Sequence, residues 1–224
     1  YEDTEGVPPT AVTRARKLVE KEEVHMLYGP WFDHTGLAVQ SYIKPLGLPF
    51  AAPMAGALVR TIDYPNALNF NYTEENNSVP FAQYAYEKLG YKRVILASSD
   101  YAWGHSTLEA FAEGFKRAGG TIVDEFYIPL GTMDMGPYLD EVKAHADEAD
   151  FIFVGVIGAD GARFHRQLVE YGLHKVIPRL DINTVSQVEL LPEIGEAAIG
   201  VVSMFPWLPE IDVPASMEFV RKFK

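Results

Sequence analysis

The chain contains no cysteine among its 224 residues. This absence excludes thiol catalysis, disulfide bonds and thiolate metal ligands, and it fits either redox compartment. Positive charge is also scarce, because 19 Lys and Arg stand against 31 Asp and Glu, for a formal net charge of -12. No nucleic-acid partner is therefore expected, since there is no basic stripe to neutralise phosphates. No apolar run approaches the ~20 residues that span a bilayer, so direct membrane insertion is not expected.

Signatures of catalysis and metal binding are missing as well. The six histidines show no pair at helical spacing and no HExxH pattern, so no metal site is expected. His145 and His165 fall in expected helices and are interpreted as surface or half-buried residues. No GxSxG motif is present, and Ser98 and Ser99 have no His and acid beside them in the sequence, so no catalytic residue is expected.

What the chain does contain is ordinary globular composition, 48% hydrophobic and 22% charged, in an alternating order of strands and helices. Alternation of this kind predicts parallel sheets with helices on both faces. The residues over 62–77 are dense in Asn, Tyr and Pro and predict an irregular connection between lobes. The expected strands cover 24–28, 49–52, 94–98, 121–127, 151–157, 176–181 and 200–204, and the expected helices 11–23, 37–45, 79–89, 107–118, 136–146, 162–171, 188–194 and 214–223.

One glycine-rich segment invites comparison with dinucleotide loops. Gly155, Gly158 and Gly161 follow an apolar strand with GxxGxxG spacing in place of GxGxxG, and no acidic residue stands in a clear ribose-binding position about 20 residues on. Close packing of a strand against a helix is the preferred interpretation, and no cofactor is expected.

The stretch over 91–104 predicts the functional site. It describes a buried strand that ends in a polar, aromatic loop and opens a helix, and ligands of open α/β sheets bind outside the carboxyl ends of strands. Trp103 fits a core position or a cleft position, and the flanking Asp100, Gly104 and His105 favour the cleft. Asp33 and His34 fit a helix cap and a ligand contact equally, and the two roles are compatible. Tyr64, Phe70 and Tyr72 are interpreted as packing residues, whereas Phe205 and Trp207 fit both cleft lining and hinge packing.

The chain contains a series of segments that, in this order, resemble those of the type I periplasmic solute-binding proteins. Among these, the resemblance is to the branched-chain amino acid group of ABC transporters. The segments are YED, ARKLVEKEEV, GP, PFAAPMAG, YAYEKLGYKRV, SDYAWG, YIPLGTMD, ADFIFVGVIGADGARFHRQLVEYGL and GEAAIGVVSMFPW. The resemblance implies an α/β fold of two Rossmann-like lobes, each a parallel sheet flanked by helices, joined by a hinge. It implies that residues 1–75 and 207–224 form an incomplete lobe one and that residues 76–206 form lobe two. The chain is accordingly expected to be an internal portion that lacks the N- and C-terminal segments.

The resemblance also implies a function. The expected protein is not an enzyme. It is expected in the periplasm or anchored at the cell surface as a lipoprotein. It captures a small organic solute, amino-acid-like, aromatic or cationic, between the lobes, and delivers it to the membrane permease of an ABC transporter. Two alternatives stay open at this point, an enzyme with a nucleotide cofactor on a Rossmann-type scaffold and the ligand-sensing domain of a receptor or regulator.

The same resemblance places candidate ligand contacts. Where amino-acid-binding members present a Ser to the ligand carboxylate, this chain has Asp33, and near the position of the acid that pairs with the ligand ammonium it has Asn183. An Asp repels a carboxylate, which favours a cationic or polyhydroxylated solute over an ordinary α-amino acid. The expected ligand-binding residues are Trp31, Asp33, His34, Thr35, Met54, Ala55, Gly56, Tyr101, Trp103, Gly158, Asp181 and Asn183.

Overall fold

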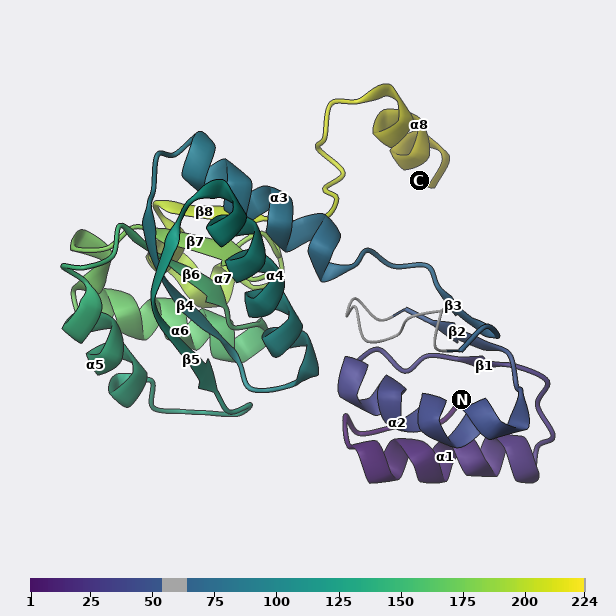
Figure 1. Ribbon diagram of the computed structural model, residues 1–224. Coiled ribbons are helices and arrows are strands. Elements are labelled where there is room, and N and C mark those ends of the chain that lie inside the picture. Colours follow the sequence, from purple (N-terminus) through teal and green to yellow (C-terminus); the bar gives the residue numbers. More distant parts are fainter. Residues whose placement is uncertain (54–63, 224) are drawn as a thin grey trace.

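Two parallel sheets, each with its own helices, divide the chain into two lobes (Figure 1). The computed structural model describes residues 1–53 and 64–223. The alternating pattern of the sequence therefore gives the expected α/β class with parallel sheets flanked by helices. The first lobe holds a three-stranded sheet of order β1-β2-β3, and the second a five-stranded sheet of order β5-β4-β6-β7-β8.

The first lobe is built from short strands and two helices. Its core brings Ala11 and Ala15 of the first helix against Val39 and Ile43 of the second, around Phe50, as the helical spacing of these apolar residues predicts. Both helices lie on the same side of the sheet in Figure 1. The elements are α1 (Pro8–Glu20), β1 (Leu27–Tyr28), α2 (Asp33–Ile43), the 3-10 turn η1 (Lys44–Leu46), β2 (Phe50–Ala52) and β3 (Ala67–Asn69).

The second lobe has longer strands and helices on both faces of its sheet. Its elements are α3 (Glu74–Glu87), β4 (Arg93–Ser99), α4 (Ala102–Ala118), β5 (Thr121–Ile128), α5 (Gly136–His145), β6 (Phe151–Gly155), α6 (Gly158–Glu170), η2 (Leu173–Lys175), β7 (Arg179–Ile182), α7 (Leu191–Ile194), η3 (Gly195–Ala198) and β8 (Val201–Met204). All neighbouring strand pairs run parallel.

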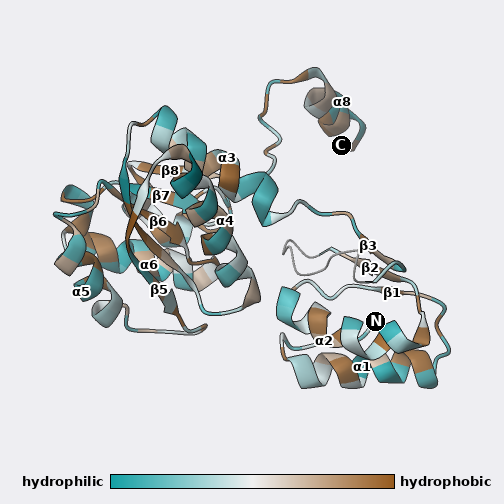
Figure 2. Ribbon diagram, in the orientation of Figure 1, coloured by the Kyte–Doolittle hydropathy of each residue, from teal (hydrophilic) through white to brown (hydrophobic). Residues whose placement is uncertain are grey.

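Strand β4 shows why this sheet is covered on both sides. Val94 and Leu96 point into a core formed with α3 and α4, whereas Ile95 and Ala97 point into a second core formed with α5 and α6. Successive residues of a strand face opposite sides, so a continuous apolar run requires cover on both faces. Figure 2 shows the hydrophobic strands enclosed between the helices.

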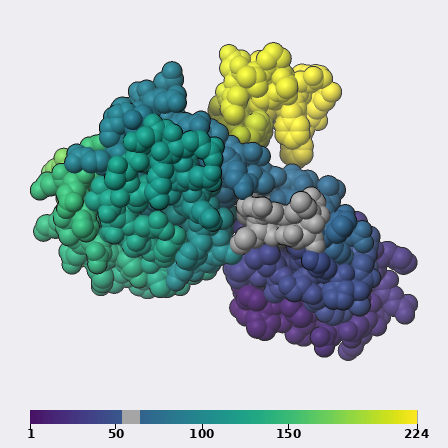
Figure 3. Space-filling model, in the orientation of Figure 1, coloured from purple at the N-terminus to yellow at the C-terminus, as the bar shows by residue number. Residues whose placement is uncertain are grey.

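The last described helix, α8 (Pro214–Phe223), stands apart from both sheets and projects with the preceding segment in Figure 3. Trp207 contacts it, because the indole Nε1 donates a hydrogen bond to Ser216 Oγ at 2.9 Å and its ring meets Phe219 edge-on at 5.6 Å. Assignment of residues 207–224 to the first lobe stays a prediction.

Several boundaries expected from the sequence were wrong in detail. The connection expected over 62–77 contains β3, which forms through its pairing with β2, and it contains the first turn of α3. A three-residue strand carries no visible periodicity, so only its partner reveals it. The helix expected over 188–194 begins at Leu191, because Pro192 fits the first turn of a helix and not its interior. Helix α4 begins at Ala102, five residues before the expected start.

Candidate functional site

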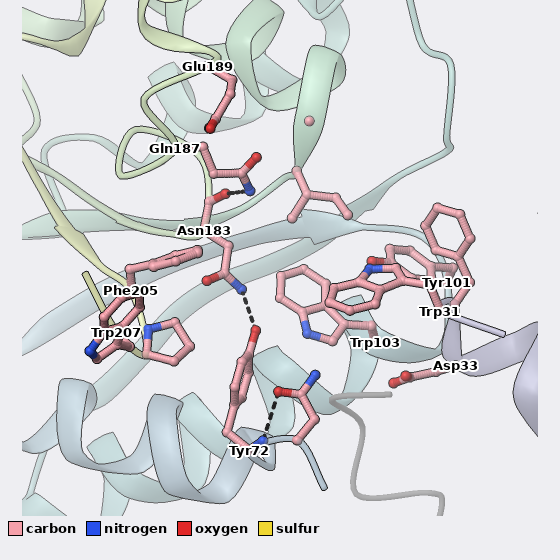
Figure 4. A pocket seen from close by; sticks show the side chains of 15 residues that line it. Trp31, Asp33, Tyr72, Tyr101, Trp103, Asn183, Gln187, Glu189, Phe205 and Trp207 are labelled. Atoms are coloured by element: carbon pink, nitrogen blue, oxygen red, sulfur yellow. Dashed lines mark hydrogen bonds between the residues drawn. The ribbon is translucent and has the colours of Figure 1, made fainter. Parts of the chain in front are cut away.

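A cavity of about 740 Å³ lies between the two lobes, where strands of both sheets end (Figure 4). Its lining comes from the start of α2, the crossing after β3, the starts of α4 and α6, the loop after β7 and the segment after β8. These positions follow the rule that open parallel sheets bind ligands beyond the carboxyl ends of their strands. The lining residues are Trp31, Phe32, Asp33, Asn71, Tyr72, Tyr101, Trp103, Ile157, Gly158, Asn183, Gln187, Glu189, Phe205, Pro206 and Trp207.

Aromatic rings dominate this lining and stand on two sides of the cavity. Tyr101 and Trp103 stack with their ring centroids 5.9 Å apart and their planes 26° apart. Phe32 meets Tyr101 edge-on at 6.2 Å. Figure 4 shows Trp31, Tyr101 and Trp103 on one side and Phe205 and Trp207 on the other. A flat apolar molecule between these two groups would lose water from both of its faces.

Glycine at position 104 makes the Trp103 side of the cavity possible. A Cβ built on Gly104 would lie 1.9 Å from the carbonyl oxygen of Ser99 at the end of β4. The first turn of α4 therefore presses directly on β4, and it holds the backbone of Trp103 at the strand end. Gly161 has the same role at α6, where a Cβ would lie 2.2 Å from the Val156 carbonyl oxygen. Close strand–helix packing, the interpretation preferred for this glycine-rich segment, is thus confirmed at Gly161.

At the cavity wall, a hydrogen bond joins the loop after β7 to the segment that crosses from β3 to α3. Asn183 Nδ2 donates to Tyr72 Oη at 3.3 Å, and Gln187 Nε2 donates to the Asn183 carbonyl oxygen. Asn183 has φ +65°, a conformation that Asn tolerates better than most residues. Burial raises the pKa of Tyr72 to about 12, so its phenol keeps its proton and can also donate. Asn183 Oδ1 is buried and accepts no hydrogen bond from the residues that the structure describes.

Beside the cavity lies a buried carboxyl group that the sequence did not single out, that of Glu74. It stands in the first turn of α3 and is 0% exposed. Trp103 Nε1 donates to Glu74 Oε1 at 2.7 Å, and Ser78 Oγ donates to Oε2 at 3.2 Å. Burial raises the pKa of Glu74 to about 7, against the opposing effect of these hydrogen bonds.

Asp33 lines the cavity from the first turn of α2 and is 2% exposed. Phe32 occupies the N-cap position and makes no side-chain cap, so Asp33 stands one residue inside the helix. An acid in the first turn interacts favourably with the helix dipole. Burial, and then the charges of Asp33 and Glu74, raises the pKa of Tyr101. The Tyr101 phenol is therefore neutral at ordinary pH.

Three expected ligand contacts lie outside the cavity lining. His34 Nε2 lies 2.8 Å from the Gly6 carbonyl oxygen, and Thr35 is fully buried with its hydroxyl donating to the Phe32 carbonyl oxygen at 2.7 Å. The His34 ring also meets the Tyr101 ring edge-on at 5.6 Å, so it packs beside a cavity residue without lining the cavity itself. Asp181, the third, is fully buried beneath the loop that carries Asn183. The expected contacts Met54, Ala55 and Gly56 fall outside the described residues.

The Asp181 carboxylate forms the support of that loop. Oδ1 accepts hydrogen bonds from the Val185 backbone N–H at 2.9 Å and from Ser203 Oγ at 2.6 Å. Oδ2 lies 3.3 Å from His165 Nε2 on α6. His165 is fully buried, which corrects its interpretation as a surface or half-buried residue: the inward face of α6 places it against this carboxylate. Asp181 thus orders the turn in which Asn183 faces the cavity.

Of the twelve expected contacts, the structure brings Trp31, Asp33, Tyr101, Trp103, Gly158 and Asn183 together at the cavity. Sequence reasoning missed several more. Tyr72, which the sequence favours as a packing residue, lines the cavity. Gln187 directly precedes the helix expected over 188–194 and Glu189 falls within it, and both precede α7. Phe205 and Trp207 line the cavity, one of the two roles left open for them. Their position directly after a strand was the available signal.

Metal-binding potential lies elsewhere in the structure. Asp124, Glu141 and His145 hold possible ligand atoms within 4.8 Å of one another, and none of the three lines the cavity. Exposed acidic groups often gather in this way without an ion. No helix of the described part of the chain is long and apolar enough to cross a membrane.

Comparisons with known proteins agree with this architecture. The model of a family described as periplasmic binding protein matches residues 1–224. Leu/Ile/Val-binding protein homolog 6 of Brucella melitensis is 30% identical over 216 residues, which are 96% of this chain and 55% of that protein. The chain thus spans about half the length of the curated relatives it matches.

Solved structures of the same architecture superpose closely. An ABC transporter substrate-binding protein from Sphaerobacter thermophilus has 38% identity and a TM-score of 0.87, and the match covers 99% of this chain and 61% of that one. A solute-binding protein of an ABC transporter from Rhodopseudomonas palustris BisB5, in complex with 3,4-dihydroxybenzoic acid, has 29% identity and a TM-score of 0.84, covering 100% and 61%.

Proposed function

Because the chain belongs to the periplasmic binding protein family, we propose that it is the solute-capturing portion of an extracytoplasmic substrate-binding protein. In this role it binds a small organic solute between its lobes and presents it to the membrane permease of an ABC transporter, without catalysing a reaction. Its place is the periplasm or, through a lipid anchor, the cell surface. The single observation that carries the proposal is the aromatic cavity between the two lobes.

We further propose that the solute is a small aromatic molecule bearing a hydroxyl group. Rings on both sides of the cavity suit a flat ring, and stacking of this kind contributes about 1 kcal/mol per pair beyond area burial. A buried acceptor such as Asn183 Oδ1 costs free energy unless a donor reaches it. A phenolic hydroxyl supplies that donor, and its oxygen can accept from Tyr72. The dihydroxylated acid bound to the relative from Rhodopseudomonas palustris has this ring and these hydroxyl groups. Its carboxylate must lie away from Asp33, which would repel it.

A thermal-shift and calorimetry series tests both steps. The panel is 3,4-dihydroxybenzoate, 4-hydroxybenzoate, benzoate, L-leucine, NAD and FAD. A bound solute at 100 times its Kd adds about 2.7 kcal/mol of stability, which is readily measured. We expect saturable binding of the hydroxylated acids, weaker binding of benzoate and no turnover of any compound.

The other outcomes separate the two proposals. Binding of L-leucine with none of the aromatic acids would refute the solute class and retain the solute-binding role, in line with the name of the Brucella relative. Binding of NAD or FAD alone would refute both proposals.

A further inference from the structure

The Glu74 carboxyl group combines complete burial with a direct hydrogen bond to a cavity residue. A buried carboxylate is costly unless donors surround it. Here the donors include the Trp103 indole at 2.7 Å and the Ser78 hydroxyl at 3.2 Å, and the Thr107 hydroxyl also favours the ionised form. Hydrogen bonds to an ionised acceptor are roughly twice as strong as neutral ones. The hydrogen bond that the indole N–H donates to Glu74 is therefore strongest when Glu74 is ionised.

This contact determines how the Trp103 ring stands in the cavity wall. The backbone at Trp103 is already set, because Gly104 packs on the Ser99 carbonyl at the start of α4. Only the two side-chain torsions of Trp103 remain to be defined. Stacking on Tyr101 restricts the ring plane, and the bond from Nε1 to Glu74 restricts its rotation within that plane.

Glu74 also connects the cavity wall to the hinge. It follows directly on the crossing that carries Asn71 and Tyr72 from β3 to α3, and both of those residues line the cavity. The bond from Trp103 to Glu74 thus ties the first turn of α4 to the first turn of α3. A change in this bond alters the wall against which a solute must stack.

We propose that Glu74 is a positioning residue of the solute site: its carboxylate orients the Trp103 indole, and its protonation state tunes solute affinity. The statement on affinity rests on the proposed function, whereas the statement on the indole does not. The ionised form holds the indole most firmly, so solute affinity is higher above the pKa of Glu74 than below it. A neutral carboxyl leaves a weaker, neutral bond, which lowers affinity by about fivefold.

Several groups face Glu74 in the part of the chain that the structure describes. From the crossing comes Tyr72 and from the turn before α4 comes Tyr101; both phenols have a raised pKa and stay neutral. From α2 comes Asp33, whose charge disfavours ionised Glu74. Ser78, on its own helix, and Trp103 on α4 do not titrate. Burial raises the pKa of Glu74 to about 7, within the working range of a binding assay.

The first test needs no solute. Trp31→Phe and Trp207→Phe leave Trp103 as the single tryptophan, and its fluorescence is followed from pH 5.5 to 8.5. We expect a transition centred near pH 7 that Glu74→Gln abolishes. Glu75→Gln, at the exposed neighbouring position, is the matched control and should keep the transition. The same transition in Glu74→Gln would overturn the proposal, whatever the protein binds.

The second test measures the Kd of 3,4-dihydroxybenzoate at pH 6 and pH 8 in the otherwise unchanged chain. We expect about fivefold tighter binding at pH 8, and in Glu74→Gln one affinity at both pH values, close to that of the unchanged chain at pH 6. Trp103→Phe keeps a ring and removes the donor, so Glu74→Gln should change the Kd no further in that background. An unaltered pH dependence in Glu74→Gln refutes the effect on affinity. If 3,4-dihydroxybenzoate does not bind at all, the proposed solute class has failed, and the fluorescence test still decides whether Glu74 orients the indole.

Discussion

The free energy of unfolding should depend on pH through the titration of Glu74, and a single substitution should remove this dependence. Burial raises the pKa of Glu74 from its ordinary 4.5 to about 7, so the folded state holds the proton more tightly than the unfolded chain does. The stabilising contribution of the protonated group is fully present below pH 4.5, and it is lost as the pH rises through 7. Each pH unit of this interval changes the free energy of unfolding by about 1.4 kcal/mol, which gives about 3 kcal/mol in total.

Glu74→Gln removes this titration and keeps the size of the side chain. Relative to the unchanged chain, the variant should therefore gain about 3 kcal/mol between pH 4.5 and pH 8. Urea unfolding at pH 4.5, 6, 7 and 8 measures the difference between the two proteins. Comparing differences cancels every other titrating group that both chains share.

Glu75→Gln is the control, because it makes the same substitution at the neighbouring, exposed position. The difference between this variant and the unchanged chain should stay nearly constant with pH. A flat difference for Glu74→Gln as well would refute the reasoning, because it would mean that water hydrates the carboxylate or that a cation neutralises it. The expected result would show that the site keeps a destabilising buried charge, as residues that serve function often do.

Three further changes test the cavity and its support. Trp103→Ala removes the stacking face and should weaken 3,4-dihydroxybenzoate binding by at least about tenfold by calorimetry; unchanged affinity would place the solute elsewhere. Asn183→Gly removes the amide side chain and tolerates the positive φ, so it should abolish most of the preference for 3,4-dihydroxybenzoate over benzoate. If the preference remained, the Asn183 amide would not be the group that recognises the hydroxyl groups. Asp181→Ala leaves Ser203, His165 and the Val185 N–H without their acceptor, and it should destabilise the chain by about 3 kcal/mol in urea unfolding; a loss below about 1 kcal/mol would show that water replaces the carboxylate.

Much of the second lobe could be predicted from the sequence because its elements are long enough to show a pattern. The apolar run at β6, the strand at β4 and the helix over 136–145 all appeared close to their expected bounds. A strand covered on both faces must be continuously apolar, and a helix must repeat its apolar residues along one face. Both requirements are local and are visible in one segment at a time.

Short elements did not carry such a pattern. Strand β3 is three residues long and follows β2 in register, with Ala67 beside Phe50. It exists because a partner strand satisfies its backbone groups, and a window of sequence that omits the partner contains no sign of it. The start of α3 was likewise hidden, since its first turn is polar and Pro80 lies within the helix.

The sequence by itself determined where a site could lie: aromatic and polar residues follow strand after strand, and parallel strands end at one edge of a sheet. That argument placed Tyr101, Trp103 and Asn183 at the cavity. Only the tertiary structure decided which neighbouring side chain does what. Asn183 faces the cavity while Asp181, two residues earlier, is buried against Ser203 and His165, and Glu74 reaches Trp103 across 29 residues of chain. The direction of a side chain in a turn and its partner on another element depend on packing between segments far apart in the sequence, which no local pattern records.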